Sequence, residues 1–417
     1  MRKKGDITVI FAVIISLYCN AGMMGFLKGN AIITLMVYGA TLGWFLLAFL
    51  SKEKIIQPIL LSSTMIIVFF AFLQVCSIFV ADKYTHSLNN MSKNILFLLV
   101  FVAMLIYYRD PEQKNGRQII LFTWIVDTVI SSIYTLYRLL ENPLLSRILA
   151  TGNVDEYIDS TVSVAGVLGF GNIYGLVLVI IALYWCIKTT NTTMKVVLLM
   201  CGVLFCYTIL QAQFFIAVVL VVTGFVVNYI FDDENSQIRG KRIFNIAMVF
   251  AFVGVTIVYL LPALIDYDVL PEMISKRIVL LYKGGSFDNL LSTSRGVVYL
   301  KSLIAIWETA GLGIVFAGGD GTGGHSEILD LIAMYGALFG AIFIGGMYKI
   351  KGLICKSIPI RPRKNYNRVW LFYLIMSVLN PSLWCPTTLC LILIIPLMYM
   401  ELQNENGEDL TIENRIN

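Results

Sequence analysis

The residues best suited to chemistry lie near the end of the longest polar segment of the chain, which runs from 262 to 336. There, His325 and the start of an apolar helix follow a glycine-rich run, Gly318-Gly319-Asp320-Gly321-Thr322-Gly323-Gly324. Backbone N–H groups of such a run, those of Gly323 and Gly324 among them, and the positive end of a helix dipole favour an anion. The segment therefore predicts a site for a group such as a pyrophosphate. The alternative is a flexible turn before a helix whose first turn carries ordinary acidic residues.

Two roles are open for His325. It is suited to act as a general base, because the pKa of an imidazole lies near physiological pH. Alternatively, it is a polar cap on the apolar helix that follows. The other histidine, His86, lies in a short loop, and two histidines cannot supply a histidine cluster. The eight cysteines are scattered without a CxxC pair, so we expect no metal site and no disulfide framework.

Two arginines are candidates for binding a phosphate, since a guanidinium can hold one with two parallel hydrogen bonds. Arg295 opens a predicted amphipathic surface helix over 293–308. Arg147 lies in a polar stretch from 141 to 161. The alternative for both is a side chain that extends from the membrane into the interfacial region.

Asp127 is an ionisable residue within an apolar segment that is long enough to cross a membrane. Such a residue is by default a candidate for a functional site. It is alternatively a structural partner of a hydroxyl group or of Arg138.

The composition predicts an all-α polytopic membrane protein. Hydrophobic residues make up 58% of the 417 residues, charged residues only 14%, and the mean hydropathy is +0.80. A membrane-spanning helix takes about 20 residues, so the length accommodates about a dozen spans in a single transmembrane domain over 1–417. We expect spans, the first of them a retained span rather than a cleaved signal, over 7–27, 31–50, 57–80, 94–108, 118–140, 163–186, 195–210, 212–230, 243–262 and 326–348, and two more on either side of Asn380-Pro381.

The distribution of positive charge predicts the orientation. If the N-terminus is cytoplasmic, 21 of the 31 lysines and arginines fall in cytoplasmic segments, as short inner loops require. Both termini are then cytoplasmic, the segment 401–417 is a disordered tail, and 263–325 is one large extracytoplasmic loop with short amphipathic helices. The net charge of +5 reflects this orientation and does not indicate nucleic-acid binding.

Several motifs resemble those of O-antigen ligases and of O-antigen or capsular polysaccharide polymerases. That family has an arginine, a glycine pair and then "HN..L", with a glycine about ten residues on. The matching residues here are Arg295-Gly296, Gly311-Leu312-Gly313, Gly324-His325-Ser326-Glu327-Ile328-Leu329-Asp330 and Tyr335-Gly336. The segment 166–175 resembles, more weakly, the family's "G-x-F-x-N-P-N", with Gly171-Asn172 matching in kind and the proline absent.

One departure from the family bears on substrate binding. At the outer turn between the seventh and eighth spans, family members commonly carry a serine-arginine pair that is thought to hold the lipid pyrophosphate. This chain has Gln211-Ala212-Gln213 there. Either Arg147, Arg277 or Arg138 takes over this role, or the substrate is held differently, with Gln213 at the turn.

The resemblance implies a metal-independent glycosyltransferase without a cofactor. It would polymerise polyprenyl-pyrophosphate-linked oligosaccharide repeats into a capsule, exopolysaccharide or O-antigen at the outer face of a bacterial plasma membrane. His325 would act as the base and Arg295 would bind the pyrophosphate, assisted by the glycine-run N–H groups. Membrane lipid, a flippase and a chain-length regulator are the expected partners.

Two other functions remain open from the sequence. A ligase that moves finished polymer to another acceptor would use the same residues. A non-enzymatic polysaccharide flippase or permease would also have about twelve spans. It would have no need for a long outer loop ending in Gly-Gly-His, and charge should line its spans, whereas Asp127 is nearly alone here.

Overall fold

The computed structural model describes residues 2–20, 31–50, 98–105, 107–108, 113–151, 166–232, 237–249, 326–380 and 385–402. Of these residues 89% are helical and none is in a strand, which confirms the all-α class. The helices are α1 (Arg2–Asn20), α2 (Ala31–Leu50), α5 (Lys114–Glu141), α6 (Leu145–Thr151), α8 (Phe170–Thr189), α9 (Thr192–Gln211), α10 (Phe215–Ile230), α15 (Glu327–Tyr335), α16 (Ala337–Ser357), α17 (Arg363–Leu379), α18 (Cys385–Leu389), η4 (Cys390–Ile394) and α19 (Ile395–Glu401), with further helical segments at 98–105 and 237–249.

The apolar helices identify a membrane protein. Within the described ranges, α5, α8 and α9 are long and apolar enough to cross a bilayer, and α10 is a shorter apolar helix. The predicted span at 57–80, the loop at 263–325 and nearly all of the tail at 401–417 lie outside the described residues. The count of twelve spans and the large loop therefore stay predictions.

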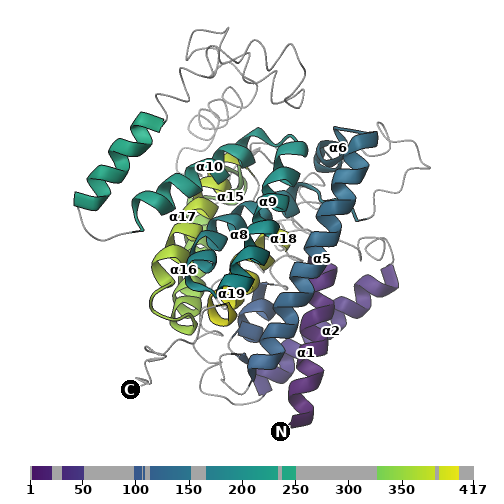
Figure 1. Ribbon diagram of the computed structural model, residues 1–417. Helices are drawn as coiled ribbons and strands as arrows, with labels where there is room; N and C mark the ends of the chain where they lie inside the picture. The colour runs from purple at the N-terminus through teal and green to yellow at the C-terminus, as the bar shows by residue number, and fades with distance from the viewer. Residues whose placement is uncertain are drawn as a thin grey trace.

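Helix α8 forms the centre of the bundle. It packs against α9, α10, α17 and α18, and Figure 1 shows it enclosed by them. Its sequence is apolar on every face, as expected for a helix surrounded by other helices. At Gly175 an added Cβ would lie 3.0 Å from the Cys390 sulfur, so the absent side chain allows the close approach of η4.

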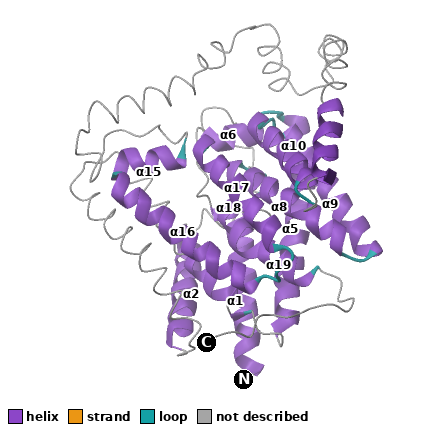
Figure 2. Ribbon diagram, turned by 90° about the vertical axis from the view of Figure 1, so that its left-hand side faces the viewer, coloured by secondary structure: helices purple, strands orange, loops and turns teal. Residues whose placement is uncertain are grey.

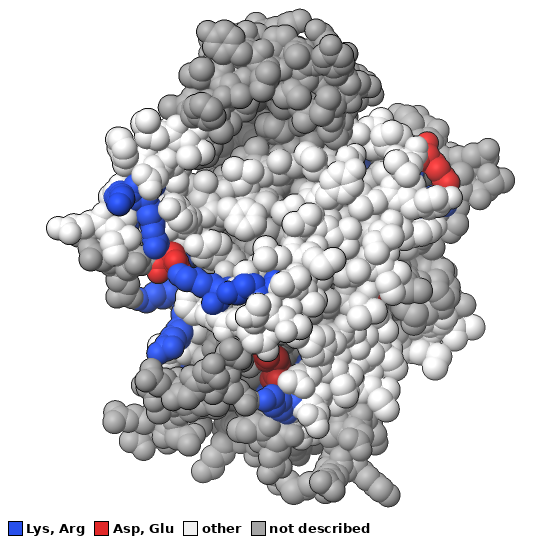
Figure 3. Space-filling model, in the orientation of Figure 1, with Lys and Arg blue, Asp and Glu red and all other residues white. Residues whose placement is uncertain are grey.

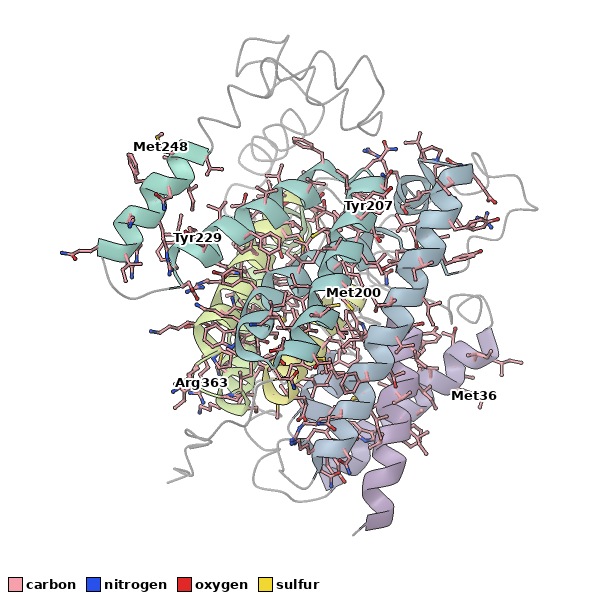
Figure 4. All side chains as sticks on the ribbon, in the orientation of Figure 1. Met36, Met200, Tyr207, Tyr229, Met248 and Arg363 are labelled. Atoms are coloured by element: carbon pink, nitrogen blue, oxygen red, sulfur yellow. The ribbon has the colours of Figure 1, made fainter. Side chains whose placement is uncertain are left out.

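The outer helices turn apolar side chains away from the bundle. On α9, Met200 is 69% exposed and Tyr207 51% exposed, and Figure 4 shows both on the outside of that helix. On the face seen in Figure 3, lysines and arginines gather on the left and extend toward the middle, a few charged groups lie lower down and at the upper right, and the rest of the described surface is broadly uncharged. Such a surface is stable against lipid hydrocarbon and would be costly in water.

Two predicted features of the C-terminal half have different outcomes. The predicted break at Asn380-Pro381 is confirmed, because α17 ends at Leu379 and Asn380 is extended, as a residue before proline prefers. The predicted continuous span over 326–348 is wrong. The chain forms α15 and α16 instead, separated at Gly336, whose φ of 87° interrupts the helix and is readily adopted only by glycine.

The last helix also departs from ideal geometry. A π-helical turn, η4, joins α18 to α19, and Pro396 lies at the start of α19. Proline has no N–H for the carbonyl one turn before it, so the ladder of hydrogen bonds changes register there.

Candidate functional site

The structure describes three of the eight residues predicted to form the site. Arg147 and Gln213 lie together, whereas Asp127 belongs to a separate buried cluster. The remaining five lie outside the described residues, so their positions stay predictions: His325, Arg295, Arg277, Gly323 and Gly324.

The turn between α9 and α10 has an unusual backbone. Ala212 continues the helical conformation, and Gln213 then adopts a φ of 61°. Among the described residues it is the only one other than glycine with a positive φ. A left-handed non-glycine residue costs about 1–3 kcal/mol and persists only where its surroundings hold it.

Contacts from the α5–α6 connection hold this turn in place. The Gln213 side chain is 3% exposed, and its Nε2 donates to the Pro143 carbonyl at 3.2 Å. The Nη1 of Arg147, on α6, donates to the Gln213 carbonyl at 3.1 Å. A guanidinium is therefore fixed at the turn where the polymerase family commonly has an arginine in the sequence itself.

Arg138 has a different environment. It forms an ion pair with Glu141 at 3.1 Å, and its guanidinium lies 6.0 Å from the ring centre of Tyr134. Asp127 precedes Arg138 by 11 residues on α5, which corresponds to a rise of about 16 Å. The alternative that these two residues pair with each other is therefore wrong.

Asp127 instead joins a cluster formed by three helices. The Nδ2 of Asn20, at the end of α1, donates to Asp127 Oδ2 at 2.7 Å and to Thr128 Oγ1 at 2.9 Å. The Nδ2 of Asn172, on α8, donates to Asn20 Oδ1 at 3.2 Å and to the Asn20 main-chain oxygen. All four residues are buried.

Sequence reasoning missed part of this cluster. Asn172 fell within the Gly171-Asn172 match but was assigned no role. Asn20 lies within an apolar segment, and an isolated asparagine there gives no pattern to detect. The contacts that join Asn20 to Asp127 bridge 107 positions in the chain.

The start of α15 identifies the helix cap next to His325. Ser326 is the N-cap, with its side chain accepting from the Leu329 N–H at 3.3 Å, and Glu327 and Asp330 lie in the first turn. The Glu327 N–H also donates to the Asn380 carbonyl at 3.4 Å, which joins α15 to the end of α17. The cap of this helix is therefore Ser326 and not His325.

The α9–α10 turn with α6 and the start of α15 lie at the same end of the bundle. Figures 1 and 2 place α6, the start of α10 and α15 at the end away from the first residues of α1. Glu401, at the end of α19, forms an ion pair with Arg117 near the start of α5, so these two helix ends meet at the opposite end.

Comparison with known proteins adds no further assignment. No model of a protein family matches the sequence, and no curated protein matches it. Within the described residues, no three His, Cys, Asp or Glu side chains are grouped as metal ligands would be.

Proposed function

We propose that the protein is a membrane glycosyltransferase of the polysaccharide polymerase type. It joins oligosaccharide repeats carried on polyprenyl pyrophosphate, at the outer face of the bacterial plasma membrane. One observation carries this proposal more than any other: the guanidinium of Arg147 is fixed at the α9–α10 turn, 3.1 Å from the Gln213 carbonyl.

The position of Arg147 fits the binding of a pyrophosphate. A guanidinium has five N–H groups in a planar fork, and one of those of Arg147 donates to the Gln213 carbonyl. It carries a permanent positive charge, and Arg147 is only partly buried, so an anion can approach from the membrane surface. Arg147 would then replace the arginine that is absent from Gln211-Ala212-Gln213.

The reaction requires a base and positive charge. An acceptor sugar hydroxyl attacks the anomeric carbon of the donor, its proton passes to His325, and the bond between that carbon and the pyrophosphate oxygen breaks. The electron pair of this bond remains on the pyrophosphate. Arg147 and Arg295, with the N–H groups of Gly323 and Gly324, stabilise the charge that develops there. Arg277, in the same predicted outer loop as Arg295, provides a further contact to the pyrophosphate.

The arrangement of α15 supports the role of His325. Ser326 supplies the helix cap, so the neighbouring histidine is not required for that purpose. α15 begins at the same end of the bundle as α6 and the start of α10. A ligase would use the same groups, and the length of the product distinguishes the two activities.

The test uses purified full-length protein and lipid-linked repeat units. Arg147→Ala should lower the polymerisation rate about 10²- to 10³-fold, which is typical for a lost charge-stabilising group. Arg147→Lys should recover only part of it, since the planar fork is lost. Arg138→Ala, which removes a guanidinium paired with Glu141 on α5, is the matched control and should retain activity. Normal polymer from Arg147→Ala at equal expression would contradict the proposal.

A further inference from the structure

The connection between α16 and α17 concentrates positive charge. Six lysines and arginines fall within 349–364, whereas the chain contains no aspartate or glutamate from 331 to 400. We call this set the basic turn, and its members are Lys349, Lys351, Lys356, Arg361, Arg363 and Lys364. Four of the six are exposed, and Figure 4 shows Arg363 at the lower left of the bundle. Any carboxylate that faces this charge must come from outside 331–400.

The start of α17 adds to this positive charge. Its N-cap, Pro362, forms no side-chain cap, and its first turn contains Arg363 and Lys364 but no acidic residue. The first turn of a helix carries the positive end of the helix dipole, so carboxylates stabilise it and cations do not. By contrast, α15 has Glu327 and Asp330 in its first turn. Orientation in the membrane favours basic connections, but it does not explain cations at this position of a helix.

The end of α19 lies beside the start of α17. The Tyr399 hydroxyl donates a hydrogen bond to Asn365 Oδ1, and the rings of Tyr366 and Tyr399 lie 6.1 Å apart. Two residues after Tyr399 the helix ends at Glu401, and Leu402 is still buried. Figure 1 places the end of α19 and the α16–α17 connection at the lower end of the bundle. The chain that follows Leu402 therefore begins next to the basic turn.

The segment after Leu402 has the opposite charge. Residues 403–417, which lie outside the described residues, contain four acidic side chains and one basic side chain. The acidic ones are Glu405, Glu408, Asp409 and Glu413. An extended chain spans about 3.5 Å per residue, so from Leu402 the carboxylate of Glu405 can reach about 10 Å and that of Asp409 about 25 Å. The first turn of α17, which Tyr399 already contacts through Asn365, is within this reach.

We propose that the acidic segment 405–413 binds to the basic turn. Its carboxylates pair with exposed cations such as Lys356 and Arg361, and they supply the negative charge that the start of α17 lacks in its own first turn. Single exposed ion pairs are weak, but a short tether holds the two segments at a high effective concentration, so several weak pairs suffice. The contact is electrostatic and therefore weakens with salt. It is independent of glycosyl transfer, and its failure would leave that function untouched.

The experiment places a photo-cross-linking benzoylphenylalanine at Leu410 of the full-length protein, purified in an uncharged detergent. Irradiation should join this position to peptides from 349–368, identified by mass spectrometry, and the yield should fall between about 0.05 M and about 0.5 M NaCl. Lys356→Gln with Arg361→Gln should lower the yield about fivefold. The control pair, Lys195→Gln with Lys241→Gln, removes the same charge from α9 and from the helical segment 237–249, and it should keep the wild-type yield.

A reversal of charge provides the second test. Glu408→Lys with Asp409→Lys should abolish the cross-link, and adding Lys356→Glu with Arg361→Glu should restore it. Cross-links that map outside 349–368, or a yield that ignores both salt and these substitutions, would overturn the proposal. The same measurement in nanodiscs compares phosphatidylcholine alone with phosphatidylcholine and phosphatidylglycerol. A cross-link that persists in both supports binding of the segment, whereas its loss with phosphatidylglycerol would assign the basic turn to anionic lipid and overturn the proposal.

Discussion

Arg147 donates a hydrogen bond to the main-chain oxygen of Gln213, a residue with a left-handed backbone, across 66 positions of the sequence. This hydrogen bond joins α6 to the turn between α9 and α10. It places a permanent positive charge at that turn and at the same time stabilises an unfavourable conformation. Charge and strain at one point are typical of a binding site.

The left-handed backbone of Gln213 predicts that a glycine variant at this position is more stable than an alanine variant, which is the reverse of the order inside a helix. Gln213→Ala removes the bond to Pro143 and keeps the unfavourable φ, whereas Gln213→Gly removes the same bond and adopts that φ freely. The glycine variant should therefore be more stable, by about 1 kcal/mol. Unfolding in detergent measures the difference. At Ala217, inside α10, the order should be the opposite, with Ala217→Gly less stable than the wild-type alanine.

The cap at Ser326 allows the roles of two neighbouring residues to be separated. Ser326→Ala should lower the stability by about 1 kcal/mol, because the Leu329 N–H loses its acceptor. His325→Ala should leave the stability unchanged and reduce turnover about 10²- to 10⁴-fold if it is the base. Thermal unfolding and polymer formation are measured on both variants. Near-normal polymer from both His325→Ala and His325→Asn would remove His325 from the mechanism.

The ion pair between Arg117 and Glu401 joins α5 to α19, and both side chains are nearly inaccessible to solvent. Glu401→Gln removes the negative charge that faces the buried Arg117 guanidinium, which should cost about 3–5 kcal/mol. Replacing both residues, as in Arg117→Met with Glu401→Leu, should cost less than the single change. A double-mutant cycle measured by unfolding tests this. The single variants Arg117→Met and Glu401→Leu complete the cycle, and a double variant whose cost equals the sum of the two would show that the charges do not depend on each other.

The orientation can be tested with reporters that are active only outside the cytoplasm. The distribution of lysine and arginine predicts activity for a fusion after Asp288, in the large loop. A fusion after Lys356, near the end of α16, should be silent. The opposite pattern would invert the orientation and place the candidate site inside the cell.

Much of the helical framework could be predicted from the sequence, because a chain in lipid must satisfy its backbone hydrogen bonds within each helix. The segment 31–50 is an example, since the predicted span has the same limits as α2. The break after Leu379 also follows from a local rule, since proline restricts the residue before it. The interruption at Gly336 was missed, because apolar composition alone cannot distinguish one helix from two in sequence.

The contacts that form the candidate site were decided by the tertiary structure. Arg147 was one of three arginines that the sequence left open, and only the packing of α6 against the α9–α10 turn brings it to Gln213. Asn20 meets Asp127 for the same kind of reason, because α1 ends beside the middle of α5. Local patterns record which residues prefer a helix and which face is apolar. The neighbours of each helix depend on how all the side chains pack together, and no single segment contains that information.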